Sequence, residues 1–181
     1  MKLDVKITKI APADNGVRAY ASATLDDCFA IRGLKLVDGK KGLFVSMPTY
    51  QKKDKSYADV CFPTTAEFRE QLNNAVIEAY QQYLAQINAI RHKYPELLLG
   101  AGRFVHMDGF KCSSEDILAR GYANGNRLAI VATTLSEGGA SGKISVPGYR
   151  FVESSSIGDV SVNAGRLKLG QHGITVLIYE K

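Results

Sequence analysis

The chain has 181 residues, of which 45% are hydrophobic, and its formal net charge is +5 at pH 7. This length is enough for one sizeable core or two small ones, and it is too short for a barrel enzyme with all of its loops. No apolar run approaches the roughly 20 residues that a membrane-spanning helix needs, so we expect a soluble protein without a membrane partner.

The amino terminus and the cysteines favour a cytoplasmic location. "MKLDVKITKI" alternates charged and apolar residues, whereas a secretory signal needs a continuous apolar stretch. Cys28, Cys61 and Cys112 are widely spaced and lie in apolar or strand-like contexts, with no C-x-x-C pair. We therefore expect reduced thiols in a cytoplasmic protein.

Five strand-like segments open the chain. Their apolar and polar side chains alternate with a period of two, which is typical of half-buried strands. They are residues 2–11, 17–25, 28–37, 43–47 and 56–62. A bend is expected near Gly33, and "DGKKG" predicts a hairpin between the third and fourth segments. The pattern predicts a five-stranded antiparallel meander that ends at Pro63.

The period then changes and predicts a long helix. Apolar residues recur at spacings of three and four from Phe68 to Ile90, and Thr64 with Glu67 fits a capping box. We expect one helix, or two nearly fused ones, that runs to about Tyr94. Its apolar stripe is expected to cover the apolar face of the meander.

After Pro95 the sequence pattern changes again. Short alternating runs are broken by Gly, Asn and Ser, and a hairpin is expected around Asn124-Gly125-Asn126. Several such strands without a helix are typical of a small β-sandwich. The predicted fold class is α+β: residues 1–92 form a small antiparallel β-meander with a C-terminal amphipathic helix, and residues 93–181 form a small all-β sandwich.

Motifs for catalysis or cofactor binding are not evident. His92, His106 and His172 are far apart, and "HMDG" is more typical of a turn than of a metal site. There is no G-x-S-x-G, and "GAGRFV" lacks the third glycine and the following helix of a dinucleotide fingerprint. We predict a protein that is not an enzyme, with no metal or cofactor.

The stretch from Lys35 to Lys55 is the one local excess of positive charge, with six lysines against Asp38 and Asp54, and it ends in a lysine-rich loop. Lys52, Lys53 and Lys55 lie close together, and Tyr50 and Tyr57 flank them. Such a loop can be a solvated hairpin tip that protects a sheet edge. That is the more usual role, but lysines can also neutralise phosphates, and tyrosines can stack on unpaired bases. Composition alone leaves both interpretations open.

Several stretches in residues 1–84 carry a family resemblance. They are "LDVKITKI", "VRAYASATLDDCFAIRGLKLVDGKKGLFVSMPTY", "YADVCFP" and "TAEFREQLNNAVIEAY". Together they resemble the SpoVG family (stage V sporulation protein G, the septation regulator of bacteria). "GLFVSMP" combined with Asp59 and Pro63 is the most specific part. The resemblance implies a small α+β domain that forms a homodimer and binds DNA or RNA as a regulator, without catalysis.

The resemblance also implies a binding surface. It is formed by the basic residues after "SMP" and by the start of the helix, which here gives Tyr50, Lys52, Lys53, Lys55 and Arg69. The sequence departs from the family at Tyr50 and Gln51, where many members are basic. Arg69 matches a position that is commonly arginine in the family, and its alternative role is a surface pair with an acid three residues away.

Residues 88–181 are similar to the C-terminal β-sandwich of barrel-type glycoside hydrolases, through "INAIRHKYPELLLGAGRFVHMDGF", "ARGYANGNRLAIVATTL" and "GQHGITVLIYEK". The catalytic carboxylates of those enzymes lie on a barrel that this chain lacks, so no hydrolase activity carries over.

Two functional hypotheses follow. The first is a regulatory nucleic-acid-binding protein linked to septation, sporulation or gene-expression control, with an appended sandwich of unknown ligand. The alternative is a non-catalytic protein or glycan interaction module that its N-terminal domain dimerises. Exposed aromatic residues on the sandwich would favour the alternative, and Tyr122 and Tyr149 are the candidates.

Overall fold

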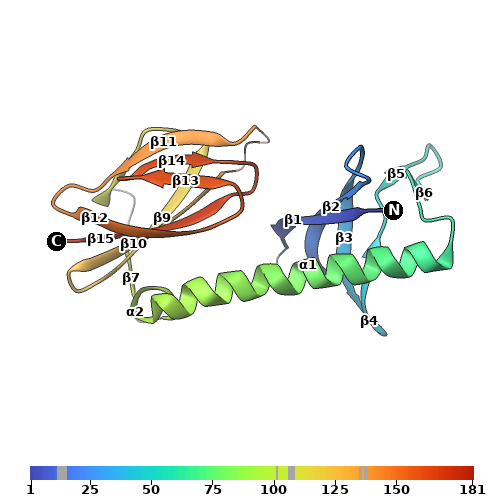
Figure 1. The fold of residues 1–181 in the computed structure, drawn as a ribbon, viewed down its shortest axis with the longest axis horizontal. Helices are drawn as coiled ribbons and strands as arrows, with labels where there is room; N and C mark the ends of the chain where they lie inside the picture. Colours follow the sequence, from blue (N-terminus) through green and yellow to red (C-terminus); the bar gives the residue numbers. More distant parts are fainter. Residues whose placement is uncertain (12–15, 101, 106–108, 135, 137) are drawn as a thin grey trace. The chain divides into compact units, whose positions relative to one another are not determined.

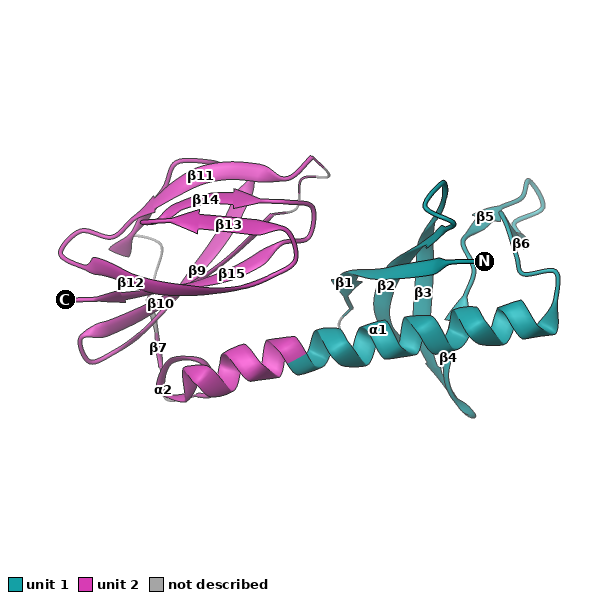
Figure 2. Cartoon of the chain, viewed as in Figure 1, with its two compact units in different colours: residues 1–85 teal, residues 86–181 magenta. Residues whose placement is uncertain are grey.

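The computed structural model describes residues 1–11, 16–100, 102–105, 109–134, 136 and 138–181. The chain forms two compact units, residues 1–85 and residues 86–181 (Figure 2). Antiparallel strands are the commonest elements of both units, and one long helix, α1 (Ala66–Lys93), is followed by the short α2 (Pro95–Leu98) (Figure 1). The prediction of an α+β chain with one long helix is confirmed. None of the helices in this described part of the chain is long and apolar enough to cross a bilayer.

A four-stranded antiparallel sheet forms the centre of unit 1. Its strands pair in chain order and are β1 (Leu3–Ile10), β2 (Val17–Leu25), β3 (Phe29–Gly39) and β4 (Gly42–Ser46). In β2 the alternation is clear, because Ala19, Ala21 and Ala23 are buried. The β2–β3 register shifts near Gly33, whose φ of 78° belongs to the left-handed region. The bend expected there is therefore a bulge.

Helix α1 packs onto this sheet through Leu72 and Val76, which are buried in the core of unit 1. The Asn73 side chain also accepts a hydrogen bond of 3.0 Å from the Val45 N–H on edge strand β4. The helix begins one residue later than the expected capping box. Thr65 Oγ1, rather than Thr64, accepts the bond from the Phe68 N–H at 3.2 Å. The capping prediction was wrong because two adjacent threonines compete, and the one directly before Ala66 is the N-cap.

The predicted fifth strand does not join the sheet. Strands β5 (Thr49–Gln51) and β6 (Tyr57–Asp59) instead form a separate two-stranded ribbon, the β5–β6 hairpin. The strand ends at Asp59, so the expected continuation through Cys61 was wrong. Val60 and Phe62 are 64% and 60% exposed. Cys61 follows the strand and is partly buried against the core of unit 1.

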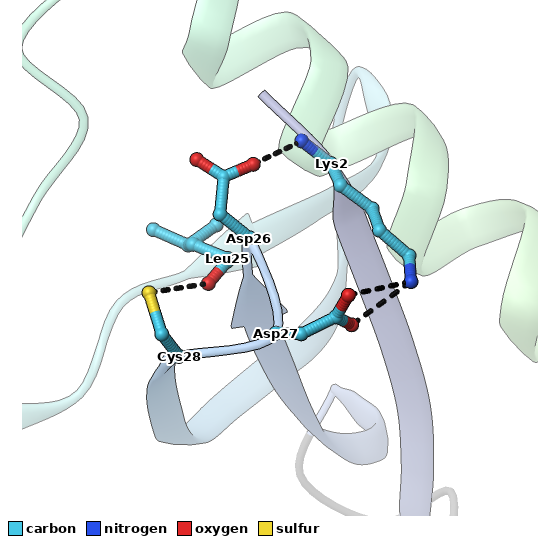
Figure 3. A network of polar contacts seen from close by, with 5 residues as sticks. All are labelled: Lys2, Leu25, Asp26, Asp27 and Cys28. Carbon is cyan, nitrogen blue, oxygen red and sulfur yellow. Dashed lines mark hydrogen bonds and ion pairs between the residues drawn. The ribbon is translucent and has the colours of Figure 1, made fainter.

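The turn between β2 and β3 anchors the amino terminus (Figure 3). The Lys2 N–H donates to Asp26 Oδ1 at 2.6 Å, and Lys2 Nζ lies 2.8 Å from the Asp27 carboxylate. Cys28 is exposed at this turn, where its Sγ donates to the Leu25 carbonyl, so the apolar or strand-like context expected for it was wrong. The thiols of Cys28, Cys61 and Cys112 are all free.

Unit 2 contains two antiparallel sheets. The five-stranded sheet has the order β12-β15-β10-β9-β7, and the four-stranded sheet has the order β13-β14-β11-β8. The strands are β7 (Arg103–Val105), β8 (Lys111–Cys112), β9 (Ile117–Asn124), β10 (Arg127–Thr134), β11 (Ala140–Ser145), β12 (Arg150–Ile157), β13 (Val160–Asn163), β14 (Arg166–Leu169) and β15 (Ile174–Glu180). Both sheets contribute to one core, in which Ile130 and Leu177 of the larger sheet lie with Ile144 and Leu169 of the smaller one. The hairpin predicted at Asn124 is confirmed, and Gly125 has a φ of 60° in its turn.

The other face of the five-stranded sheet has a second, smaller cluster. Tyr94 and Leu97 of the helical segment are buried against Ala129, Val176 and Ile178 of the sheet. These side chains alternate with those of the main core along β10 and β15, as expected of strands buried on both faces. The "HMDG" turn expected at residues 106–109 lies mostly outside the described residues.

Candidate nucleic-acid interface

Main-chain hydrogen bonds shape the tip of the β5–β6 hairpin. Three residue pairs join the strands, and the five residues from Lys52 to Ser56 connect them. The Lys52 N–H donates to the Ser56 carbonyl at 2.8 Å, and the Lys55 N–H donates to the Lys52 carbonyl at 3.0 Å. Lys55 has a φ of 65°, the left-handed conformation that closes the turn. The tip is thus a defined turn in which the lysine side chains take no part.

The one acidic side chain of the loop, Asp54, is hydrogen-bonded to Ser56 within the same loop. Asp54 Oδ1 accepts hydrogen bonds from the Ser56 hydroxyl at 2.6 Å and from the Ser56 N–H at 3.0 Å. The hydroxyl bond is the main reason that the pKa of Asp54 is lowered, with the main-chain bond second. An aspartate side chain that accepts a hydrogen bond from the residue two positions later commonly stabilises a turn. Asp54 therefore fixes the loop and does not pair with a lysine.

The three lysines of the tip are exposed and make no ion pair within the described part of the chain. The contrast within unit 1 is Lys2, which is held by Asp27. Lys52, Lys53 and Lys55 are adjacent in the turn, so their positive charges reinforce one another at one end of the ribbon. Such a group attracts anions and surrounds itself with counterions that a phosphate backbone can release.

Two aromatic rings flank the lysines. Tyr50 is 54% exposed and Tyr57 is 68% exposed. Tyr50 pairs with Ala58 and Tyr57 with Gln51, so the two tyrosines belong to neighbouring pairs. Because successive pairs point to opposite faces of a ribbon, each face presents one ring. The hairpin can therefore stack a base on either face.

Tyr57 stands out in the sequence only as a neighbour of the lysines. Its greater exposure makes it at least as accessible as Tyr50, to which the family resemblance points. The signal that could have found it is the alternation of the short strand. Successive residues of a strand point to opposite faces, so Tyr57 and Asp59 share one face of the hairpin and Ala58 lies on the other.

Arg69 lies on a different element from the hairpin. It is exposed near the start of α1, and its N–H donates to the Thr65 carbonyl at 3.2 Å. Within the described residues its guanidinium makes no ion pair, so the alternative role as half of a surface pair has no support. The residues that share the hairpin are thus four of the five predicted ones: Tyr50, Lys52, Lys53 and Lys55.

The described residues also bear on metal binding and on nucleophilic catalysis. Among the residues that the structure describes, no group of three or more His, Cys, Asp and Glu side chains is arranged to hold a metal ion. The free thiol of Cys28 is exposed, but a single cysteine without an adjacent base is not a catalytic arrangement.

Comparisons with known proteins concern unit 1. The SpoVG family model matches residues 1–82. An Archaeoglobus fulgidus protein named "Putative septation protein SpoVG" is 44% identical over 79 residues, which are 44% of this chain and 92% of the relative. Proteins of the same name from Treponema denticola and Myxococcus xanthus are 34% and 36% identical over 79 and 86 residues. Those matches cover 44% and 48% of this chain and 84% and 85% of the relatives.

Proposed function

The chain belongs to the SpoVG family, and from this premise we propose that it is a regulatory nucleic-acid-binding protein whose β5–β6 hairpin contacts phosphates. The observation that carries the proposal is the tip of the hairpin, where Lys52, Lys53 and Lys55 are exposed and the single acid, Asp54, is bonded to Ser56. Three cations without an internal partner among the described residues form a surface suited to a polyanion.

The chemistry of lysine indicates the kind of contact. Its ammonium is a flexible point charge and lacks the planar fork that arginine uses for bidentate recognition of a base. Contacts through Lys52, Lys53 and Lys55 should therefore position the protein along a backbone without reading its sequence. Tyr50 and Tyr57 add stacking surfaces that any unpaired base can use. Both DNA and RNA meet these requirements.

The names of the relatives support a proposal for the process that this binding serves. The relatives are named as septation proteins, and we assign this chain a regulatory role of that type, in septation, sporulation or gene-expression control. In this proposal the protein acts in the cytoplasm and is not an enzyme, and binding needs no cofactor. Arg69, exposed near the start of α1, is a further phosphate contact.

A homodimer through unit 1 is part of the proposal. Within the described strands, β1 and β4 each have one neighbour in the sheet, so each is an edge strand, although the Val45 N–H of β4 already donates to Asn73. Phe44 on β4 is an exposed aromatic beside that edge. Two copies that share an interface could place two hairpins on one nucleic acid. Once the first hairpin is bound, the effective concentration of the second is raised. Light scattering of the full chain at micromolar concentration should give the dimer mass, and a monomer mass would count against this step.

Unit 2 is, in this proposal, an appended β-sandwich. The alternative of a glycan or protein module depends on exposed aromatic rings. Tyr122 is only partly exposed, and Tyr149 packs against the main core beneath Lys181, whose Nζ is 5.3 Å from the ring centroid. Neither ring offers the open platform that this alternative requires, so the regulatory role is the better supported of the two.

The experiment that tests the proposal is a binding titration of the full chain. Labelled DNA and RNA of random sequence, single-stranded and duplex, are titrated at several salt concentrations and followed by fluorescence anisotropy. We expect binding to all sequences with similar affinity and a linear fall of log K with log salt. The absence of binding to every probe at low salt would refute the proposal.

A further inference from the structure

Unit 2 contains a cavity that the proposed function does not use. It has a volume of about 300 Å³ and lies between the end of α1, α2 and one face of the five-stranded sheet. All of its lining residues belong to residues 86–181, so it is formed within this unit alone. Its volume is at the lower end of the range of small-molecule sites, which is about 300–1,000 Å³.

The walls are almost entirely apolar. The helical side contributes Ile87, Ile90 and Leu98, and the sheet contributes Val131, Ile157 and Ile174. The sheet residues form a continuous surface because Val131 pairs with Val176, and Ile157 pairs with Ile174. Ile90, Leu98 and Val131 are only partly buried at the margin of the smaller cluster. Such walls favour an apolar guest, because contact with them removes apolar surface from water.

One charged residue stands among these walls. Arg91 lines the cavity, and no carboxylate does. Arg91 is exposed and has no ion pair within the described residues. Two acids of neighbouring elements are already engaged, because Glu153 lies 2.8 Å from Lys93 and Glu96 lies 2.7 Å from Arg127. The guanidinium at the cavity is thus available to an external anion.

A second cation lies on the same face of the sheet. Arg120 on β9 is paired directly with Val131, so the two side chains point to the same side. Arg120 is exposed, and it makes no ion pair in the part of the chain that the structure describes. The surroundings of the cavity are therefore positive, which adds to the preference for an anionic head group.

We propose that this cavity binds a small amphipathic carboxylate, with its linear apolar tail among the isoleucines and its carboxylate on Arg91. A planar guanidinium matches a carboxylate through two parallel hydrogen bonds, which is the geometry that arginine supports best. The small volume selects a medium-length tail. This site is independent of the hairpin and of nucleic-acid binding.

The test is calorimetry of the full chain with hexanoate, octanoate and 1-octanol. Octanoate should bind saturably with a Kd below about 1 mM. Each methylene added between hexanoate and octanoate should tighten binding about fourfold, because each CH₂ leaves water. Methyl NMR should show shifts at Ile87, Ile90 and Ile174, with Ile130 of the main core unshifted as an internal control.

The variant Arg91→Gln separates the head-group contact from the tail contact. The preference for octanoate over octanol should fall about tenfold or more, since a charge-assisted bond is removed while the tail contact remains. Arg150→Gln, an exposed arginine on β12 that does not line the cavity, is the matched control and should keep the full preference. No binding of octanoate, an unchanged preference in Arg91→Gln, or shifts confined to other residues would overturn the proposal.

Discussion

The basic side chains beside the five-stranded sheet and those at the tip of the β5–β6 hairpin differ in whether an acid pairs with them. In unit 2, Arg127 donates a hydrogen bond of 2.7 Å to Glu96 and forms an ion pair of 3.1 Å with Glu180. Lys93 lies 2.8 Å from Glu153 and donates to it, which raises the pKa of Lys93 and lowers that of Glu153. In unit 1, the lysines of the β5–β6 hairpin have no such partner among the described residues.

This difference separates structural charge from available charge. A cation paired within the fold is already partly neutralised, and its pair adds about 0–1 kcal/mol to stability when exposed. An unpaired cation adds nothing to the fold, yet it retains counterions that a phosphate can replace. The net charge of +5 therefore says less about binding than the location of acids such as Asp54 and Glu153.

The largest expected effect tests whether the units are separate at all. Leu72→Ala removes a buried side chain from the core of unit 1 and should lower its free energy of unfolding by about 2–5 kcal/mol. Leu128→Ala, in the core of unit 2, is the reciprocal control. Hydrogen exchange read by mass spectrometry should show reduced protection in the mutated unit only. An equal loss of protection in both units would show that they do not unfold separately.

The next effect concerns pH and belongs to unit 2. Burial raises the pKa of Tyr179 to about 12, and its hydroxyl donates to the Ile144 carbonyl. Between about pH 10 and 12 the unfolded chain has released this proton while the folded chain keeps it, so stability falls as pH rises.

The expected slope is about 1.4 kcal/mol per pH unit, and Tyr179→Phe should remove that contribution. Denaturant unfolding across the alkaline range is the measurement. The variant should also lose a little stability at neutral pH, because the Ile144 carbonyl loses a donor. An identical alkaline slope in wild type and variant would mean that this phenol is not protected.

A smaller effect contrasts paired with unpaired cations directly. Arg127→Met should lower stability by about 1–2 kcal/mol, because it leaves the carboxylates of Glu96 and Glu180 without their shared cation. Alanine at Lys52, Lys53 and Lys55 together should change stability by less than about 0.5 kcal/mol. Thermal unfolding checks both. A large destabilisation of the hairpin variant would show that its lysines are structural after all.

The smallest effect concerns backbone strain in one hairpin turn of unit 2. The β13–β14 turn has Ala164 with a φ of 46° before Gly165, a conformation that strains an alanine. Ala164→Asn creates the Asn-Gly pair that such a turn prefers and should raise stability by about 0.5–1 kcal/mol. Chemical denaturation is the measurement, and Asn163→Ala, outside the turn, is a suitable control. No gain would mean that the strain is relieved elsewhere.

Much of the fold could be predicted from periodicity. The three- and four-residue spacing predicts the helix to within a residue or two of Lys93, and alternation predicts β2 with Ala19, Ala21 and Ala23 inside. Such patterns follow from the geometry of the backbone and need no knowledge of partners. Helix ends are less secure, as the shift from Thr64 to Thr65 illustrates.

The candidate site was only partly predictable. Its lysines and Tyr50 could be found, but the sequence of residues 56–62 suggested one apolar strand, whereas Val60 and Phe62 are exposed. The sequence alone does not show whether an apolar residue is buried or exposed. The bond between Asp54 and Ser56 was also not predicted, because a local side-chain bond within a turn has no periodic signal in the sequence. Exposure and local hydrogen bonds need the three-dimensional arrangement.

The most direct test of the central claim is the salt dependence of nucleic-acid binding in two charge-matched triple variants. One carries alanine at the unpaired cations Lys52, Lys53 and Lys55. The other carries alanine at three paired cations, Lys2, Arg18 and Lys93, whose partners are Asp27, Asp38 and Glu153. Both remove the same formal charge from the chain.

On duplex DNA, the hairpin variant should flatten the slope of log K against log salt by about 2–3 units per protomer, at about 0.9 for each phosphate that is no longer neutralised. The paired variant should keep the wild-type slope, since its cations release no counterions to the nucleic acid. Equal slopes in the two variants, or a wild-type slope in the hairpin variant, would contradict the account.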